Sequence, residues 1–257
     1  MMESERCCND MNEFWQTALE QDLFPGDLVV EIGRFFLDAP YQAGTLDTAG
    51  KEKLVINLAE FDCTTFVETV LALARCASAG NLSPLPFRNN VKFIRYRQGK
   101  IDGYASRLHY FTDWLRENEK KKVLKDVSRL LNGTAYRKKI NFMTVHRDCY
   151  AGLKNESQLR RMLLVEKNLS RRVFYMIGRD KVARRQSGIQ QGDIIAFAAD
   201  QEGLDVAHVG FAVRQGGHLH LLHASGKEGA VVISRETLGA FLKSNKKFTG
   251  ILVARFS

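Results

Sequence analysis

The spacing of apolar residues divides the chain into a helical first part and a β-rich last part. Apolar residues recur every three or four positions in 11–24 and 27–37, which predicts two amphipathic helices. Proline and glycine break this pattern at 39–47. The run KLVINL at 53–58 is typical of a short strand, and the apolar spacing at 63–77 predicts a buried helix.

The middle of the chain, 86–190, predicts helices with irregular connections, and 102–118 places clustered aromatic residues before a helix. Short β-rich runs follow at 192–199, 205–213, 218–225, 230–234 and 248–256. The residues QGG at 215–217 are suited to a hairpin turn. Helices followed by an antiparallel meander predict an α+β fold. We expect a single elaborated domain: a helical half at 10–85, a mostly helical insertion at 86–190 that lines a substrate cleft, and a β half at 191–257.

Composition excludes some classes of protein. The 257 residues are 45% hydrophobic and 26% charged, which is ordinary for a globular protein. No apolar run reaches the roughly 20 residues that a membrane span needs. The N-terminus lacks a signal pattern, so either the protein is cytoplasmic or a leader is missing from the sequence. The net charge of +9 favours anionic partners, but aromatic residues do not interleave with the basic runs as nucleic-acid binding requires.

The five cysteines, at 7, 8, 63, 76 and 149, are odd in number and irregularly spaced, which argues against a disulfide framework, and the lack of a CxxC pair argues against a zinc site. Cys63 differs from the others because it follows Asp62, a good N-cap residue, at the predicted start of a helix. Free backbone N–H groups there stabilise an anion and lower a thiol pKa. Cys63 is therefore a candidate nucleophile, with simple packing in the core as the alternative.

Four of the six histidines (His208, His218, His220, His223) lie within 16 positions of the β-rich part. A hairpin across 215–217 would bring His208 beside His223, as a base and the group that orients it. Strand parity places His218 and His220 on the opposite face. A zinc site built from these histidines is the alternative, but neighbouring strand positions face opposite ways, so we expect neither metal nor cofactor. His109 and His146 are expected to be surface or capping residues.

Four segments in order resemble the NlpC-type cell-wall cysteine peptidases, which are papain-like. APYQAG (39–44), DCTTFV (62–67), QGDIIAF (191–197) and HVGFAV…LLHAS (208–225) match the motifs of that family. The resemblance implies Cys63 as nucleophile, His208 as base, His223 as the third member, and Tyr41, with Thr64, as support near the oxyanion. Thr65 and Gln191 depart from the family pattern, and Cys63 and His208 are 145 positions apart.

Over 25–255 the chain is similar to one branch of that superfamily, the N-acetylmuramoyl-L-alanine amidases that act on anhydromuropeptides. This resemblance implies a cysteine amidase that cuts between N-acetylmuramic acid and L-alanine in peptidoglycan fragments. We also expect a monomer without a membrane span, located in the periplasm or cell envelope, with a cytoplasmic location as the alternative. Cleavage between γ-D-glutamate and a diamino acid, acyl transfer, and a non-enzymatic peptidoglycan-binding module remain open.

Substrate contacts are expected on both sides of the cleft. Aromatic rings stack on sugar faces and arginine binds carboxylates through a two-pronged contact. The candidate substrate-binding residues are Asp62, Tyr104, Ser106, Arg107, Tyr110 and Trp114. The alternative for the aromatic residues is that they pack a helix onto the core.

Overall fold

The computed structural model describes residues 23–47 and 50–257, and nearly all of the helix expected at 11–24 lies outside them. A single eight-stranded sheet has the order β2-β3-β8-β4-β5-β6-β7, and β1 also pairs with β8. Every strand pairing in it is antiparallel. The strands are β1 Leu124–Asp126, β2 Thr134–Tyr136, β3 Phe174–Gly178, β4 Ile194–Ala199, β5 Val206–Gln215, β6 His218–Ser225, β7 Ala230–Ile233 and β8 Phe248–Phe256.

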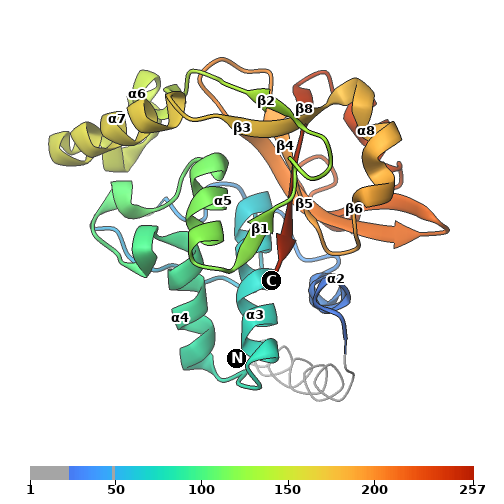
Figure 1. Cartoon of the computed structure of the whole chain (residues 1–257). Coiled ribbons are helices and arrows are strands. Elements are labelled where there is room, and N and C mark those ends of the chain that lie inside the picture. Colours follow the sequence, from blue (N-terminus) through green and yellow to red (C-terminus); the bar gives the residue numbers. More distant parts are fainter. Residues whose placement is uncertain (1–22, 48–49) are drawn as a thin grey trace.

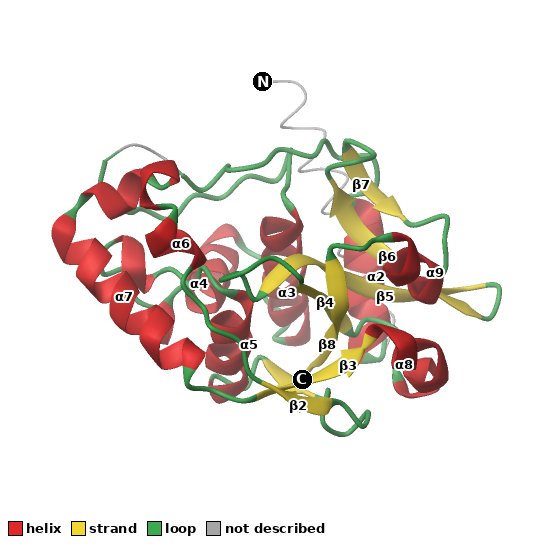
Figure 2. Ribbon diagram, turned by 90° about the horizontal axis from the view of Figure 1, so that it is seen from above, coloured by secondary structure: helices red, strands yellow, loops and turns green. Residues whose placement is uncertain are grey.

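The helices flank this sheet on both sides. They are α2 Pro25–Phe35, α3 Cys63–Ser78, α4 Pro84–Arg95, α5 Phe111–Lys120, α6 Phe142–Val145, α7 Glu156–Ser170, α8 Arg179–Arg185 and α9 Leu238–Ser244. Short 3₁₀ turns occupy Arg97–Gly99, Tyr104–Ser106, Arg147–Cys149, Ala151–Lys154 and Gln186–Gly188. Figure 2 shows α3, α4 and α5 on one side of the sheet and α8 and α9 on the other, and Figure 1 shows α8 on the opposite side from α4 and α5. The α+β class with an antiparallel sheet is thus confirmed.

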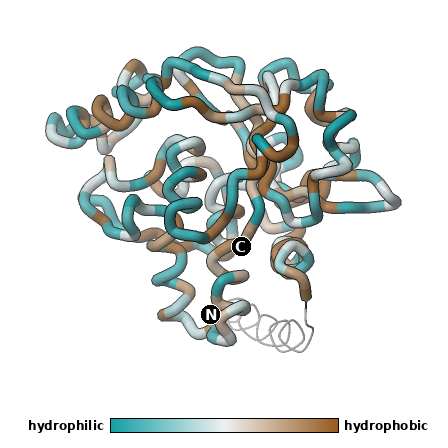
Figure 3. Tube along the Cα trace, viewed as in Figure 1, coloured by the Kyte–Doolittle hydropathy of each residue, from teal (hydrophilic) through white to brown (hydrophobic). Residues whose placement is uncertain are grey.

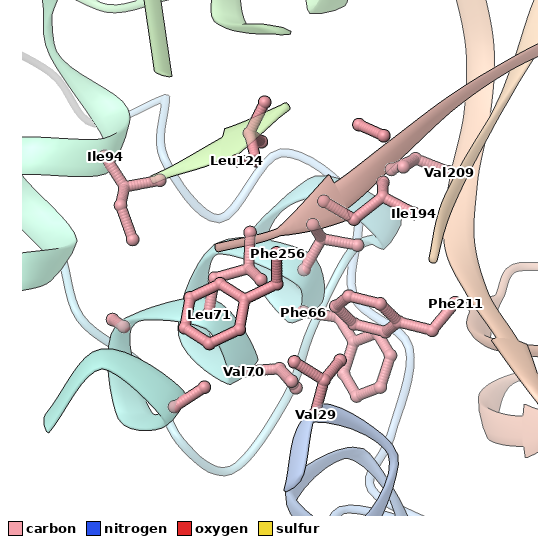
Figure 4. Close-up of a cluster of buried hydrophobic side chains, with 14 of the residues drawn as sticks. Val29, Phe66, Val70, Leu71, Ile94, Leu124, Ile194, Val209, Phe211 and Phe256 are labelled. Carbon is pink, nitrogen blue, oxygen red and sulfur yellow. The ribbon is translucent and has the colours of Figure 1, made fainter. Parts of the chain in front are cut away.

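Alternation along the central strands explains these layers. In β4, Ile194 and Ala196 face the core that α2 and α3 cover, whereas Ile195 and Phe197 face the core beneath α8 and α9. The whole strand is therefore buried and apolar, and Figure 3 shows the hydrophobic colour concentrated along the strands and α3. In Figure 4, Phe66 of α3 meets Phe211 of β5, with ring centroids 5.8 Å apart.

The predicted β half agrees closely with the structure. All five expected runs form strands, and β5 and β6 are joined by a two-residue turn. Gly216 and Gly217 both have positive φ, 54° and 82°, the conformation that this tight hairpin turn requires.

One expectation from the sequence is wrong, because the run at 53–58 forms no strand. The segment 86–190, expected to be mostly helical, also contributes β1, β2 and β3 to the sheet, which the sequence did not predict. These strands have three to five residues, too few for a periodic pattern to separate them from loops.

Within the described residues, the structure has no helix that is both long and apolar enough to cross a membrane.

Candidate active site

Cys63 is the first residue of α3, and its neighbours form a complete helix cap. Asp62 Oδ1 accepts the backbone N–H groups of Thr64 (3.0 Å) and Thr65 (2.7 Å). In return, the Thr65 hydroxyl oxygen accepts the N–H of Asp62 at 2.9 Å. The predicted N-cap is confirmed, and Thr65, which departs from the family motif, closes this capping box. These hydrogen bonds hold the Asp62 carboxylate at the helix end. They favour a structural role for Asp62 over the expected contact with substrate.

The thiol of Cys63 lies against the start of β5. The Val209 backbone and the Thr64 hydroxyl both contribute hydrogen bonds that favour a thiolate, and Thr64 Oγ1 is 4.0 Å from Sγ. Burial outweighs these contacts and, with the nearby Asp62 carboxylate, raises the pKa of Cys63 to about 11. The expected lowering of the thiol pKa is therefore wrong, because the desolvation of the thiol exceeds the effect of the helix end.

His208 of β5 and His223 of β6 form a hydrogen-bonded pair, as strand parity predicted. His208 Nε2 is 2.7 Å from His223 Nδ1, and the two rings meet edge to face. Val209, whose backbone reaches the Cys63 thiol, directly follows His208 in the chain. Burial lowers the pKa of His208 to about 3, with His223 adding to the effect, and burial lowers the pKa of His223 to about 4. The resting pair is uncharged.

Gly210, two positions after His208, leaves the space that the His223 side chain occupies. A Cβ on Gly210 would lie 2.8 Å from the Cβ of His223 and 2.7 Å from the Leu222 carbonyl oxygen, so no larger residue fits there without a shift. Phe241 of α9 covers both imidazoles, with ring centroids 6.3 Å from His208 and 5.5 Å from His223. A β-bulge falls next to His208, a feature that often re-aims side chains at active sites.

The other two histidines of the β half lie away from this pair. His220 Nδ1 is 2.9 Å from the Ser234 carbonyl oxygen, and His218 is exposed. Among the described residues, no group of three or more His, Cys, Asp or Glu side chains is arranged to hold a metal ion.

Tyr41 lies close to the thiol, where the resemblance implied it. Burial, followed by electrostatic interaction with Cys63 and Asp62, raises the pKa of Tyr41. Its backbone is fixed by a hydrogen bond from its N–H to the Gly229 carbonyl at 2.8 Å and by a bridge to Phe61. The hydroxyl therefore stays protonated and can donate a hydrogen bond.

A cavity of about 190 Å³ opens beside the start of α3. Asp62 and Thr64, which flank Cys63, line one part of it, and the segment Tyr104–Tyr110 lines another. Phe142, Met143 and Tyr150 add an apolar wall from farther along the segment 86–190.

Arg107 lines this cavity, but it already has two partners. Its Nη2 is 2.7 Å from Asp47 Oδ1, and its Nε is 3.3 Å from Glu52 Oε1. The guanidinium also lies over the Tyr104 ring, 4.9 Å from the centroid. Neither Asp47 nor Glu52 was expected from the sequence, because each lies more than 50 positions before Arg107.

The packing of the aromatic residues favours the alternative to sugar stacking, in which they hold a helix on the core. A Cβ on Gly152 would lie 2.2 Å from ring atoms of Tyr104, so the glycine backbone packs closely against that ring, and the Arg107 guanidinium lies over it. Tyr110 and Trp114 are 2% and 1% exposed, and they donate hydrogen bonds to Glu166 and Glu68. These rings pack α5 onto the core.

Ser106 is also engaged within the protein. It is buried, its hydroxyl donates to the Gly103 carbonyl at 2.7 Å, and it accepts the Asp102 N–H at 2.9 Å. These bonds fix the loop that precedes Arg107, so they favour a structural role for Ser106 over the expected substrate contact.

His109 is the residue that the sequence interpretation misplaced. It was expected to be a surface or capping residue, yet it lines the cavity with Arg107. Its position after Arg107 and Leu108 gives no signal of this, because it depends on the irregular turn at Tyr104–Ser106.

The fold and the site define an α+β protein with a thiol at a helix terminus, next to the strand that carries one member of a buried histidine pair. The chain belongs to the AmiA-like family, described as N-acetylmuramoyl-L-alanine amidase-like, whose model matches residues 31–251. Membership in this family supports a hydrolase of the amidase type. No curated protein matches the chain significantly.

Solved structures agree on the fold. A Bacteroides uniformis N-acetylmuramoyl-L-alanine amidase is 40% identical, covers 91% of this chain and 99% of its own, and has a TM-score of 0.86. A Bacteroides fragilis protein named as a candidate xylanase is 42% identical, covers 88% of this chain and 99% of its own, and has a TM-score of 0.83. A Legionella pneumophila protein at 22% identity, covering 98% and 95%, shares the fold with a TM-score of 0.73.

Proposed function

We propose that this protein is a cysteine-dependent N-acetylmuramoyl-L-alanine amidase with a papain-like, NlpC-type core. It hydrolyses the amide between N-acetylmuramic acid and L-alanine in peptidoglycan fragments. The observation that carries the proposal is the position of Cys63 at the start of α3, beside the Val209 backbone and hence the His208–His223 pair. Family membership supports the choice of an amide as the bond that is cut.

Activation begins from an uncharged thiol and an uncharged imidazole. Since His208 Nε2 faces His223, its Nδ1 is the nitrogen left to accept the thiol proton. As Sγ of Cys63 attacks the carbonyl carbon, this proton moves to His208, so the ion pair forms during attack. His223 holds the ring of His208 in the required orientation.

The remaining steps balance with the same residues. The C–N bond breaks as His208 returns the proton to the L-alanine nitrogen, leaving a muramoyl thioester on Cys63. Water, deprotonated by His208, then releases muramic acid and the free thiol. The N–H groups of Thr64 and Thr65 are bound to Asp62, so the Cys63 N–H and the Tyr41 hydroxyl are the proposed donors to the oxyanion. Thr64 supports the site through its hydroxyl.

The carboxylates of the cavity argue against glycosidase chemistry, which the name of the Bacteroides fragilis neighbour would suggest. That chemistry needs two available carboxyl groups on either side of the sugar bond. Asp62 caps α3, and Asp47 is paired with Arg107. Glu68 is 2.6 Å from Arg95 Nε and accepts the Trp114 indole N–H. Each carboxylate therefore already has a structural partner.

The proposed substrates are small fragments that retain the sugar, with the 1,6-anhydro form of muramic acid as the natural one. Residues of the segment 86–190 line much of the cavity beside Cys63. The resemblance implies that compact endopeptidases of this superfamily lack this segment. We propose that the enzyme acts in the periplasm or cell envelope, as a monomer and without metal or cofactor.

Product masses test this proposal. Wild-type protein incubated with anhydromuropeptides should release the free anhydro-disaccharide or anhydromuramic acid and a peptide that begins at L-alanine. Cys63→Ala should abolish release, whereas Cys76→Ala, at the buried far end of α3, should retain it. Release of L-alanyl-D-glutamate would instead identify an endopeptidase, and activity surviving in Cys63→Ala would exclude the thiol mechanism.

A further inference from the structure

The charged side chains that line the cavity each bind a partner among the described residues. Asp62 binds the end of α3, Glu68 binds Arg95 and Trp114, and Arg107 binds Asp47. The Tyr104 hydroxyl is 3.4 Å from Asp47. A ligand in this cavity must therefore be bound by polar atoms that make no hydrogen bond within the protein.

His109 retains one such group. Its Nε2 is 2.9 Å from the Tyr104 carbonyl oxygen, which only accepts hydrogen bonds, so Nε2 carries the ring proton. Nδ1 is then a bare acceptor, and it makes no hydrogen bond to any residue that the structure describes. Burial, followed by the positive charge of Arg107, lowers the pKa of His109 to about 3, so the ring stays neutral at ordinary pH.

The ring is also held in place. It lies against Tyr104, with centroids 4.4 Å apart, and Tyr104 is fixed in turn by Arg107 and Gly152. The same cavity reaches Asp62 and Thr64, the two residues that flank Cys63. A group that meets His109 is thus attached close to the bond that Cys63 would attack.

We infer that His109 is a specificity-determining residue whose Nδ1 accepts a hydrogen bond from the muramoyl sugar. The donor is an uncharged hydroxyl or acetamido N–H, because a carboxylate presents only acceptors to a bare nitrogen. The first side chain on the peptide side, the methyl of L-alanine, has no hydrogen bond to give. This inference rests on the proposed function and names the part of the substrate that this cavity recognises.

Two substrates and two variants test the inference. The substrates are 1,6-anhydro-N-acetylmuramoyl-L-alanyl-D-isoglutamine and lactoyl-L-alanyl-D-isoglutamine, which share the scissile amide and differ by the sugar. His109→Gln can still donate to the Tyr104 carbonyl but places no acceptor at the Nδ1 position. His109→Asn places an amide near Nδ1 but does not reach that carbonyl.

We expect His109→Gln to lower kcat/KM about tenfold or more on the sugar substrate, since it leaves a desolvated donor unpaired, and to leave the lactoyl substrate unchanged. His109→Asn should recover part of the loss on the sugar substrate. Equal losses on both substrates would show that His109 only supports the loop, and no loss on either would show that the sugar does not reach it. Both results overturn the inference.

Binding separates this inference from the proposed reaction. In the Cys63→Ala background, calorimetry should show tighter binding of the sugar substrate, and His109→Gln should remove that difference. If wild-type protein cuts neither substrate but this binding difference is present, the reaction is wrong and the role of His109 stands. If the substrates bind equally in the Cys63→Ala protein, the inference fails whatever the reaction.

Discussion

His223→Ala is expected to impair catalysis through His208 while leaving Cys63 untouched. The His223 side chain is 3% exposed, its Nδ1 is 2.7 Å from His208 Nε2, and its ring packs against Phe241. Truncation removes the only hydrogen-bond partner that His208 Nε2 has among the described residues. His208 is then free to rotate away from the thiol.

The magnitude follows from this single lost contact. Leaving a buried polar group without a partner costs about 1–3 kcal/mol, and about 1.4 kcal/mol corresponds to tenfold in rate. We therefore expect kcat/KM to fall about 10–100-fold in His223→Ala. His223→Asn keeps a hydrogen-bonding amide near the Nδ1 position and should recover most of this loss.

Steady-state hydrolysis of anhydromuropeptides measures the effect. His220→Ala is the matched control, because His220 lies on the same strand, three positions away, and contacts Ser234 on the other face. It should retain nearly full activity, as should His218→Ala at an exposed position. Full activity in His223→Ala, or a larger loss in His220→Ala, would refute the assigned strand register and the role of the pair.

Two further predictions concern stability. Glu68→Gln breaks the ion pair with Arg95, whose two side chains are 2% and 3% exposed, so the free energy of unfolding should fall by about 3–5 kcal/mol in urea titrations. The control Glu31→Gln breaks an exposed pair with Arg34 and should change that free energy by less than about 1 kcal/mol. The pKa of His223 is about 4 in the folded protein and 6.5 in the unfolded chain, so between these values the unfolded chain binds a proton that the folded protein does not. The free energy of unfolding that depends on neutral His223 is therefore full above pH 6.5 and is lost as pH falls toward about 4. Unfolding titrations at pH 7.5 and 5 should therefore show a smaller loss of stability on acidification in His223→Asn than in wild type, and an equal loss in both would contradict the lowered pKa of His223.

The features of the site that depend on residues close in sequence, or on one hairpin, could be predicted from the sequence. The cap at Asp62 follows from residue type, and the pairing of His208 with His223 follows from strand parity and a glycine turn. Both features need only neighbours along the chain or one hairpin. Gln191 shows how a departure from a motif is accommodated, because its side chain binds Asp27 of α2 at 2.6 Å and accepts the Arg214 N–H at 3.1 Å.

Features that depend on distant packing could not be predicted in this way. Nothing in the sequence indicates that Trp114 donates a hydrogen bond to Glu68, 46 positions earlier, instead of stacking on a sugar. The same limit explains the error for Cys63. The helix end that favours a thiolate is visible in the sequence, but the burial that raises its pKa depends on how β5 packs against α3.

The segment 86–190 both stabilises the fold and lines the cavity, and this double role limits which of its residues can select the substrate. Its strand β3 pairs with β8, and its Arg95 and Trp114 both bind Glu68 of α3, so these residues hold the sheet and α3 together. Side chains committed to such contacts cannot turn toward a ligand without weakening the core. Recognition must then come from residues at the cavity surface that retain an unused polar atom. His109 meets this condition while Tyr110 and Trp114 do not, which is why a neutral acceptor, and not an aromatic platform, is the feature that we expect to select the sugar.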